Sequence, residues 1–360
     1  MSNNIQRKEY LDMMRIIAIF FVLFNHCPGY ELYQISEGGK TWLYMFATMV
    51  TRINVPLFFM VSGALLLGKN ESYKILLKKR FVRFGMVVFV FSLCKYLENI
   101  CRIFYNNGEW IFSCKDYIRG TLYGGLEGSY WFLYAYLGMI LTLPFLRKIC
   151  SQITKEDIIM LLGVHFVFSS LLPMLNLFLS IVGIEGIAIS DHLSIPLSSV
   201  KALFYPIIGY YIEHYVDIRK INNKDLNVIL SVAILGILLS CICTYYEGIN
   251  SGYTQNYVQL FDYVTAICAY VVIKKLYFEI INRNGMRRRG TYISLIGSLT
   301  FGMYLLDPFL KGLFYNWLTG MVGAFLPVIL TSVVWCVFSM ILGGMLTYVM
   351  KQIPILKKLI

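Results

Sequence analysis

The sequence predicts an all-α polytopic membrane protein, with ten transmembrane helices in a single domain over residues 1–360 and both termini on the cytoplasmic side. Two observations predict this fold class. Of the 360 residues, 58% are hydrophobic and 14% charged, and the apolar runs approach the roughly 20 residues that cross a bilayer as a helix. The basic residues gather in alternate connections, so we interpret the net charge of +12 as a topology signal and expect no nucleic-acid partner.

The first three predicted helices cover residues 12–28, 41–67 and 84–105. The first ends at Pro28-Gly29, a pair that breaks helices. The connection 68–83 carries six lysines and arginines, which assigns it to the cytoplasmic side. Segment 106–129 is too charged and too rich in glycine to span a membrane, and we expect an outer loop with a short interfacial piece there.

The other seven predicted helices cover residues 130–146, 157–181, 197–214, 226–246, 257–278, 292–314 and 322–350. Basic connections follow the inward-running helices, for example Arg147-Lys148 and Arg287-Arg288-Arg289. With alternate sides assigned, 23 of the 32 lysines and arginines fall on the cytoplasmic side and 4 on the outer side, when residues near a helix end (Lys274, Lys275 and Lys311) are counted with the connection that follows. This imbalance agrees with the positive-inside rule for ten spans.

The first predicted helix carries an arginine and a histidine, Arg15 and His26, inside an otherwise apolar run. Ionisable side chains within a membrane span are costly and usually mark a functional path. Eleven residues are about three helical turns, so both side chains lie on one face, roughly 16 Å apart along the axis. The structural alternative is that Arg15 extends to the headgroups and His26 bonds a backbone carbonyl.

Four ionisable residues from different helices fall at one depth, roughly 20 to 25 Å from the cytoplasmic edge if each helix rises about 1.5 Å per residue. They are His26, Arg52, Glu98 and Asp307. We therefore expect a polar chamber that opens to the outside. Lys95 and Arg102 share a helical face with Glu98, so a structural salt-bridge ladder is the alternative there.

Arg15 is expected near the cytoplasmic entry, beside the basic run Lys78, Lys79, Arg80 and Arg83. This run is either a cationic inner mouth or only a topology and headgroup determinant. Trp131, at the outer entrance, is either part of an interfacial aromatic belt or a platform for a sugar. The nine cysteines include no CxxC pair, so we expect neither a metal site nor a disulfide framework.

Five short motifs are similar to those of one known family. They are Leu11-Asp12-Met13-Met14-Arg15 with His26 after ten intervening residues, Val55-Pro56-Leu57-Phe58-Phe59-Met60-Val61-Ser62-Gly63, Lys79-Arg80-Phe81-Val82-Arg83, Tyr130-Trp131-Phe132-Leu133 and Thr300-Phe301-Gly302-Met303-Tyr304-Leu305. Each motif alone is weak. In this order and on these helices, they resemble the acyltransferase-3 family of membrane acyltransferases over nearly the whole chain.

The resemblance implies an enzyme that transfers an acyl group from cytoplasmic acyl-CoA to a carbohydrate hydroxyl at the outer face of a membrane, here a bacterial cytoplasmic membrane. Acetyl-CoA is the first donor to expect, and the acceptor is a cell-surface or lipid-linked glycan. The family's arginine and histidine of the first helix correspond to Arg15 and His26. Succinyl or longer acyl groups, and a homodimer as well as a monomer, stay open.

Acyl transfer needs a base, a stabiliser for the oxyanion and a grip on the donor. His26 is the predicted base because imidazole titrates nearest to neutral pH. Asp307 stands where family members often carry a histidine, and we expect its carboxylate to orient His26, with a changed acceptor as the alternative. The residues predicted to grip the CoA phosphates are Arg15, Lys79, Arg80 and Arg83. Those predicted to contact the acceptor are Arg52, Glu98, Trp131 and Tyr304, and the oxyanion donor is left open among Ser62, Tyr304 and Arg52.

A different class of protein explains the same buried charges. A transporter or flippase for a small molecule or a lipid-linked sugar would also place ionisable residues in the membrane. Binding of acetyl-CoA distinguishes the two hypotheses, because a transporter of this kind has no need for it. A structural scaffold is the third hypothesis, and it leaves the buried charges without a role.

Overall fold

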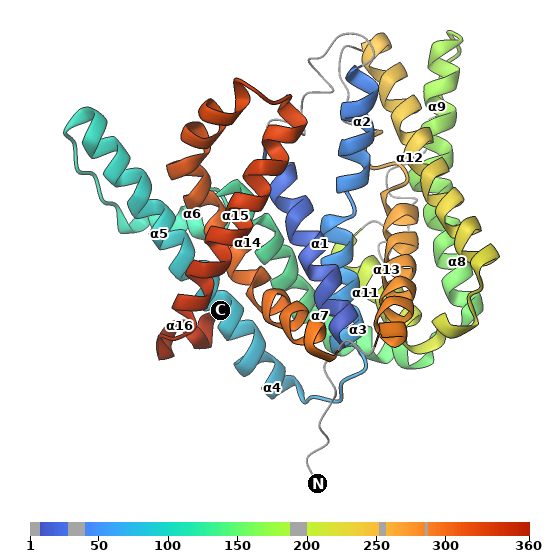
Figure 1. The fold of residues 1–360 in the computed structure, drawn as a ribbon, viewed down its shortest axis with the longest axis horizontal. Helices are drawn as coiled ribbons and strands as arrows, with labels where there is room; N and C mark the ends of the chain where they lie inside the picture. The colour runs from blue at the N-terminus through green and yellow to red at the C-terminus, as the bar shows by residue number, and fades with distance from the viewer. Residues whose placement is uncertain (1–7, 28–39, 188–199, 252–256, 285–286) are drawn as a thin grey trace.

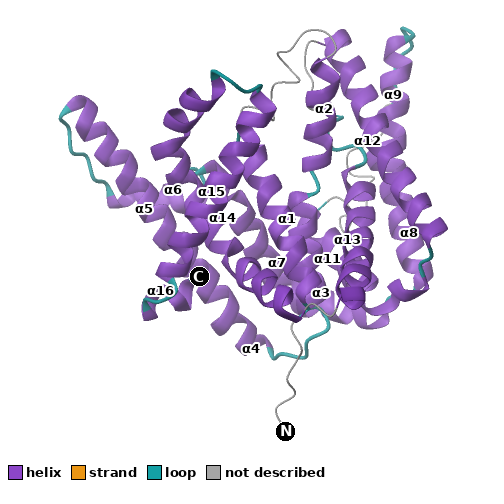
Figure 2. Ribbon diagram, viewed as in Figure 1, coloured by secondary structure: helices purple, strands orange, loops and turns teal. Residues whose placement is uncertain are grey.

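The computed structural model describes residues 8–27, 40–187, 200–251, 257–284 and 287–360, and this part of the chain is helical with no strand (Figures 1 and 2). The long helices are α1 (Glu9–Asn25), α2 (Lys40–Thr51), α3 (Asn54–Leu66), α5 (Val82–Asn107), α6 (Cys114–Tyr123), α7 (Trp131–Gln152), α8 (Lys155–Phe166), α9 (Leu172–Ile181), α11 (Lys201–Tyr215), α12 (Asn223–Ser251), α13 (Asp262–Asn284), α14 (Arg287–Gly323) and α15 (Val328–Met350). Short helices α4 (Tyr73–Leu76) and α16 (Pro354–Leu359) complete the set. The all-α prediction is confirmed for these residues.

Seven helical segments of the described chain are long and apolar enough to cross a membrane: Thr41–Leu66, Tyr73–Asn107, Gly128–Gln152, Lys155–Ile181, Asn223–Ile249, Tyr292–Gly323 and Val328–Met350. The other three predicted spans coincide with α1, α11 and α13, which do not meet that measure. Helices α1 and α11 have only 17 and 15 described residues, and α13 carries Lys274, Lys275 and Glu279 within its length. The count of ten spans and the cytoplasmic position of both termini therefore stay predictions.

Helix α1 lies at the centre of the molecule (Figure 1) and packs against α2, α3, α13, α14 and α15. Its buried side chains, among them Met14, Ala18, Ile19 and Leu23, are fully enclosed. A central helix is covered by protein rather than by lipid, so it can carry polar groups that a lipid-facing helix cannot. This position explains why the ionisable residues gather on α1.

The helix predicted over residues 41–67 is in fact two helices, α2 and α3, separated by a turn at Arg52-Ile53. The Asn54 carboxamide accepts a hydrogen bond from the Val55 amide (2.6 Å), and Pro56 has no amide hydrogen to satisfy. An interruption at membrane depth is tolerated where the freed backbone is buried in protein or lines a polar cavity. The break thus places Arg52 against such a cavity, described below.

Helices α3 and α11 cross in close contact through two glycines. A methyl group added at Gly63 would lie 2.0 Å from the carbonyl oxygen of Pro206, and one added at Gly209 would lie 2.1 Å from that of Met60. Small residues let membrane helices approach until their backbones touch. This contact fixes α3, which bears one wall of the cavity.

The predicted outer loop 106–129 contains the short helix α6, which folds back along α5 (Figure 1). The Tyr117 hydroxyl donates to the Phe89 carbonyl (2.8 Å) and so ties α6 to α5. Glu127 and Ser129, at the end of this segment, return to the centre of the molecule at the start of α7.

Adding one methyl group at the α3–α11 crossing should destabilise the fold. We expect Gly63→Ala to lower stability by about 1–3 kcal/mol, since the new atom meets backbone that cannot move aside. Gly138→Ala in α7 is the matched control, because no atom lies within 4 Å of the added methyl there. Thermal unfolding of the purified protein in detergent measures both, and equal melting temperatures would contradict the close crossing.

Candidate active site

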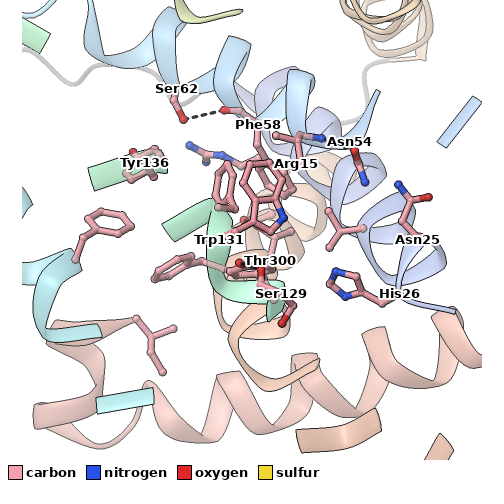
Figure 3. A pocket seen from close by; sticks show the side chains of 18 of the residues that line it. Arg15, Asn25, His26, Asn54, Phe58, Ser62, Ser129, Trp131, Tyr136 and Thr300 are labelled. Atoms are coloured by element: carbon pink, nitrogen blue, oxygen red, sulfur yellow. Dashed lines mark hydrogen bonds between the residues drawn. The ribbon is translucent and has the colours of Figure 1, made fainter. Parts of the chain in front are cut away.

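A cavity of about 590 Å³, the main cavity, runs between α1, α3, α5, α7 and α14 (Figure 3). Its wall includes the following polar residues: Arg15, Asn25, His26, Arg52, Asn54, Ser62, Arg83, Ser129, Tyr136, Ser298, Thr300 and Tyr304. Aromatic rings, including Phe58, Trp131 and Phe132, form much of the rest. The structure thus brings Arg15 and His26 into one cavity, as their shared helical face predicts.

His26 lies at one end of this cavity and is held by Asp307 of α14. The Nδ1 atom of His26 is 2.6 Å from Oδ2 of Asp307, and the Asp307 side chain is 2% exposed. An ionised carboxylate can only accept, so Nδ1 donates and the ring is held with Nε2 as its basic nitrogen. Among the described residues, no hydrogen bond to Nε2 is recorded. The Lys311 ammonium donates to the His26 carbonyl oxygen and fixes the backbone of the same residue.

Arg15 lies at the other end of the main cavity. Its Nη1 atom donates to Oδ1 of Asp12 (3.0 Å), one turn earlier on α1, and Asp12 is buried against Gly297 of α14. The Ser294 hydroxyl also donates to Asp12 (3.3 Å). The carboxylate uses one nitrogen of the guanidinium and leaves the side chain 30% exposed. Arg15 is therefore positioned and still accessible from the cavity.

The basic run after α3 divides into two parts. Arg83 lines the main cavity and donates to backbone oxygens of Leu359 and Ile360 (3.4 and 3.0 Å). Lys79 is exposed and lies outside the cavity wall. Arg80 also lies outside it, because its guanidinium makes a two-point ion pair with Glu71 (2.7 and 3.1 Å). Of the cationic mouth predicted from the sequence, only Arg15 and Arg83 lie in the wall.

Glu71 joins three segments near this end of the cavity. Besides Arg80, it pairs with Arg147 of α7 (3.1 Å), whose Nε atom donates to the Leu66 carbonyl at the end of α3 (3.1 Å). The hydrogen bond from Arg80 is the main cause that lowers the pKa of Glu71 from 4.5 to about 2, and the hydrogen bond from Arg147 has a smaller effect in the same direction. This cluster holds α3, α7 and the segment before α5 together.

Three of the predicted acceptor contacts line the main cavity: Arg52, Trp131 and Tyr304. Tyr304 donates its hydroxyl to the Ser129 carbonyl, and Ser62 donates to the Phe58 carbonyl (2.8 Å, Figure 3). Both hydroxyls therefore donate to the backbone, and an oxyanion would have to compete for those protons. Arg52 lines the same cavity and its guanidinium carries five donors, so it stays a candidate oxyanion stabiliser beside them.

Glu98, the fourth predicted acceptor contact, lies outside the main cavity. It pairs with Lys95 (2.8 Å) and Arg102 (2.6 Å), as the ladder alternative predicts. Lys95 and Arg102 line another cavity of about 570 Å³, the second cavity, with Cys27, Glu127, Pro308, Lys311, Gly312, Tyr315 and Asn316. Asn25, His26 and Ser129 line both cavities. His26 therefore stands at the boundary between the two.

Sequence reasoning missed Asn25, Ser129 and Lys311. Among the described residues, the buried Asn25 amide oxygen has no hydrogen-bond partner, and a buried polar atom without a partner is uncommon enough to call for an explanation. An amide directly before a histidine at the end of an apolar helix was the available signal. For Ser129 and Lys311, the signal was weaker, since both belong to segments that read as outer loops or helix ends.

These features define a class: a helical membrane protein in which a buried carboxylate aligns a histidine between two cavities, with arginines at the far end of one. Such a site can take a proton from a hydroxyl and hold an anionic donor. The chain belongs to the acyltransferase-3 family, since that family's acyltransferase domain matches residues 8–348. It is a membrane acyltransferase. No curated protein and no solved structure matches the chain.

The Glu71 cluster makes stability depend on pH. A carboxyl group with a lowered pKa in the folded protein stabilises it above about pH 4.5, and the contribution is lost as pH falls toward 2. Glu71→Gln should therefore lower the melting temperature at pH 7 by a few degrees, with the difference from wild type shrinking below pH 4.5. Glu109→Gln, an exposed position, is the control. A pH-independent difference would argue against the ion pair as the cause.

Proposed function

We propose that this acyltransferase moves an acyl group, acetyl in the first instance, from cytoplasmic acyl-CoA to a hydroxyl of a cell-surface or lipid-linked carbohydrate at the outer face of the cell membrane. The observation that carries the proposal is the position of His26 in the walls of both cavities. A base at such a boundary can reach a donor in one cavity and an acceptor in the other. Neither substrate then has to cross the membrane whole.

The main cavity suits the donor. The three residues in its wall that were predicted to contact the acceptor would then meet the acyl group and the pantetheine arm instead. Arg15 and Arg83 lie toward the end of α1 and α5 that the distribution of basic residues assigns to the cytoplasm. Guanidinium groups bind phosphates through paired charge-assisted hydrogen bonds. Arg15 and His26 lie roughly 16 Å apart along α1, and the extended pantetheine arm of CoA likewise separates its phosphates from its thioester. The phosphates would lie at Arg15 while the thioester reaches His26.

The chemistry at His26 is a direct transfer. Nε2 takes the proton of the acceptor hydroxyl while the hydroxyl oxygen forms a bond to the thioester carbonyl carbon. The carbon–sulfur bond then breaks, the carbonyl reforms, and the departing thiolate takes the proton from the imidazolium to leave as the CoA thiol. Asp307 stabilises the imidazolium between these steps. Arg52 or the Asn25 side-chain amide would donate to the oxyanion.

Removing the base should abolish transfer without loss of donor binding. We expect His26→Ala to lower kcat by roughly 10²- to 10⁴-fold, the usual contribution of a general base. The kcat of Asp307→Asn should lie between that of His26→Ala and that of wild type, because the imidazole ring of His26 is kept and its alignment is lost. Transfer of labelled acetyl groups in membranes measures kcat, and a thermal shift with acetyl-CoA shows that both variants still bind the donor. An active His26→Ala protein would refute the assignment.

Removing the inner arginine should weaken the donor instead. With Arg15→Ala, the KM for acetyl-CoA is expected to rise about tenfold or more while kcat changes little, the scale of one charge-assisted hydrogen bond. Acetyl-pantetheine, which lacks the nucleotide phosphates, is the matched donor. The KM for acetyl-pantetheine should be equal for wild type and variant. An equal rise in KM with both donors would show that Arg15 does not bind the phosphates.

A further inference from the structure

We infer that the second cavity is the acceptor site and that it selects an acceptor with a negative charge beside the reacting hydroxyl. This inference rests on the proposed function and adds the chemical class of the acceptor. The anion is either a carboxylate on the sugar itself or a phosphate that links the glycan to a lipid. Both present oxygen atoms to a lysine or arginine in the same way.

The charges lining the second cavity support this assignment. Its wall holds three cations, Lys95, Arg102 and Lys311, and one carboxylate, Glu127. Glu98, outside the wall, pairs with the first two cations, so cations still exceed carboxylates by one. A neutral sugar is usually bound by amides, hydroxyls and aromatic faces, and it needs no such excess of ammonium and guanidinium groups. A cavity lined mainly by one sign of charge attracts ligands of the opposite sign.

The three cations differ in how they are compensated. Lys95 lies between Glu98 (2.8 Å) and Glu127 (3.5 Å), and Arg102 pairs with Glu98 (2.6 Å). For Lys311, the described residues place no carboxylate within ion-pairing distance. Its recorded contacts are the His26 carbonyl oxygen and the face of the Tyr315 ring, 5.7 Å from the ring centre. Within the described part of the chain, Lys311 is thus the cation of this wall whose charge no carboxylate compensates.

Lys311 is also close to the reacting centre. Its ammonium group bonds the backbone of His26, the residue whose ring lies at the boundary of the two cavities. An anion held by Lys311 would therefore lie within about one sugar residue of the base. That distance makes Lys311 a specificity-determining residue, since it can orient the sugar that carries the acceptor hydroxyl.

A structural role is the rival explanation for Lys311. A cation near the C-terminal end of a helix stabilises its last carbonyl groups, and His26 ends α1. A lysine with this role alone would hold His26 in place for every acceptor. Its removal would lower kcat equally for neutral and anionic sugars, whereas loss of recognition would raise the KM for anionic sugars only.

The test compares three acceptors of equal glycan length: a neutral oligosaccharide, one that contains a carboxylate sugar, and the neutral oligosaccharide on a polyprenyl pyrophosphate. Purified wild type should use at least one anionic acceptor with a kcat/KM about tenfold or more above that of the free neutral one. Lys311→Gln keeps a hydrogen-bond donor. It should erase the preference by raising the KM for the anionic acceptor. Lys115→Gln, on the distant helix α6, is the matched control and should keep the preference. The anionic acceptor that wins identifies the source of the anion.

Two results would overturn the inference: wild type that uses neutral and anionic acceptors equally, or Lys311→Gln that loses kcat equally with both. Equilibrium binding of the same three acceptors to His26→Ala protein separates this inference from the proposed function. If binding favours anions and depends on Lys311 but wild type transfers no acyl group, the proposed function is refuted and the anion-binding site in the second cavity stands. Transfer by wild type without any preference would refute only the charge selection.

Discussion

The hydrogen bond between His26 and Asp307 is the contact on which the rest of the site depends. A carboxylate as buried as Asp307 costs several kcal/mol unless a charged or strongly donating partner compensates it, and His26 is that partner at 2.6 Å. The bond joins two helices that are 281 residues apart at this contact. It therefore fixes the register of α1 against α14 as well as the orientation of the base.

A second contact at the other end of α1 makes that register unambiguous. Asp12 packs against Gly297 and accepts from Ser294, both on α14, while His26 meets Asp307 further along the same helix. The contacts advance in the same direction on both helices, so α1 and α14 run parallel. Arg15 and His26 keep a constant separation because α1 is one continuous helix, and its two contacts with α14 hold both residues in place along the cavity. A donor with charge at one end and a thioester at the other needs such a spacing.

The sequence predicted the all-helical class and the shared face of Arg15 and His26, because both depend on local pattern. Apolar periodicity and basic connections located the helices, and spacing alone put Arg15 and His26 on one face. Helical rise even placed Asp307 at the level of His26. The break between α2 and α3 was not predictable in this way, since Pro56 is tolerated near a helix start as well as at a kink. The break is tolerated because it lines the main cavity, and that cavity forms only when distant segments fold together.

The partners of the other charges could not be predicted, for a related physical reason. A guanidinium binds a phosphate or a carboxylate equally well, so the sequence gives no means to separate Arg15 and Arg83 from Arg80. The fold separates them by what already occupies each one. Glu71 meets Arg80 at two points, so a phosphate would have to displace a carboxylate of the same charge.

Neither cavity arginine makes a two-point ion pair with one carboxylate among the described residues. Arg83 donates to backbone oxygens of Leu359 and Ile360, and Arg15 gives one nitrogen to Asp12. The same reasoning distinguishes Lys311 from Lys95, which two carboxylates hold. In a protein with many more cations than carboxylates, binding capacity for anions is set less by where the cations are than by where the few carboxylates are.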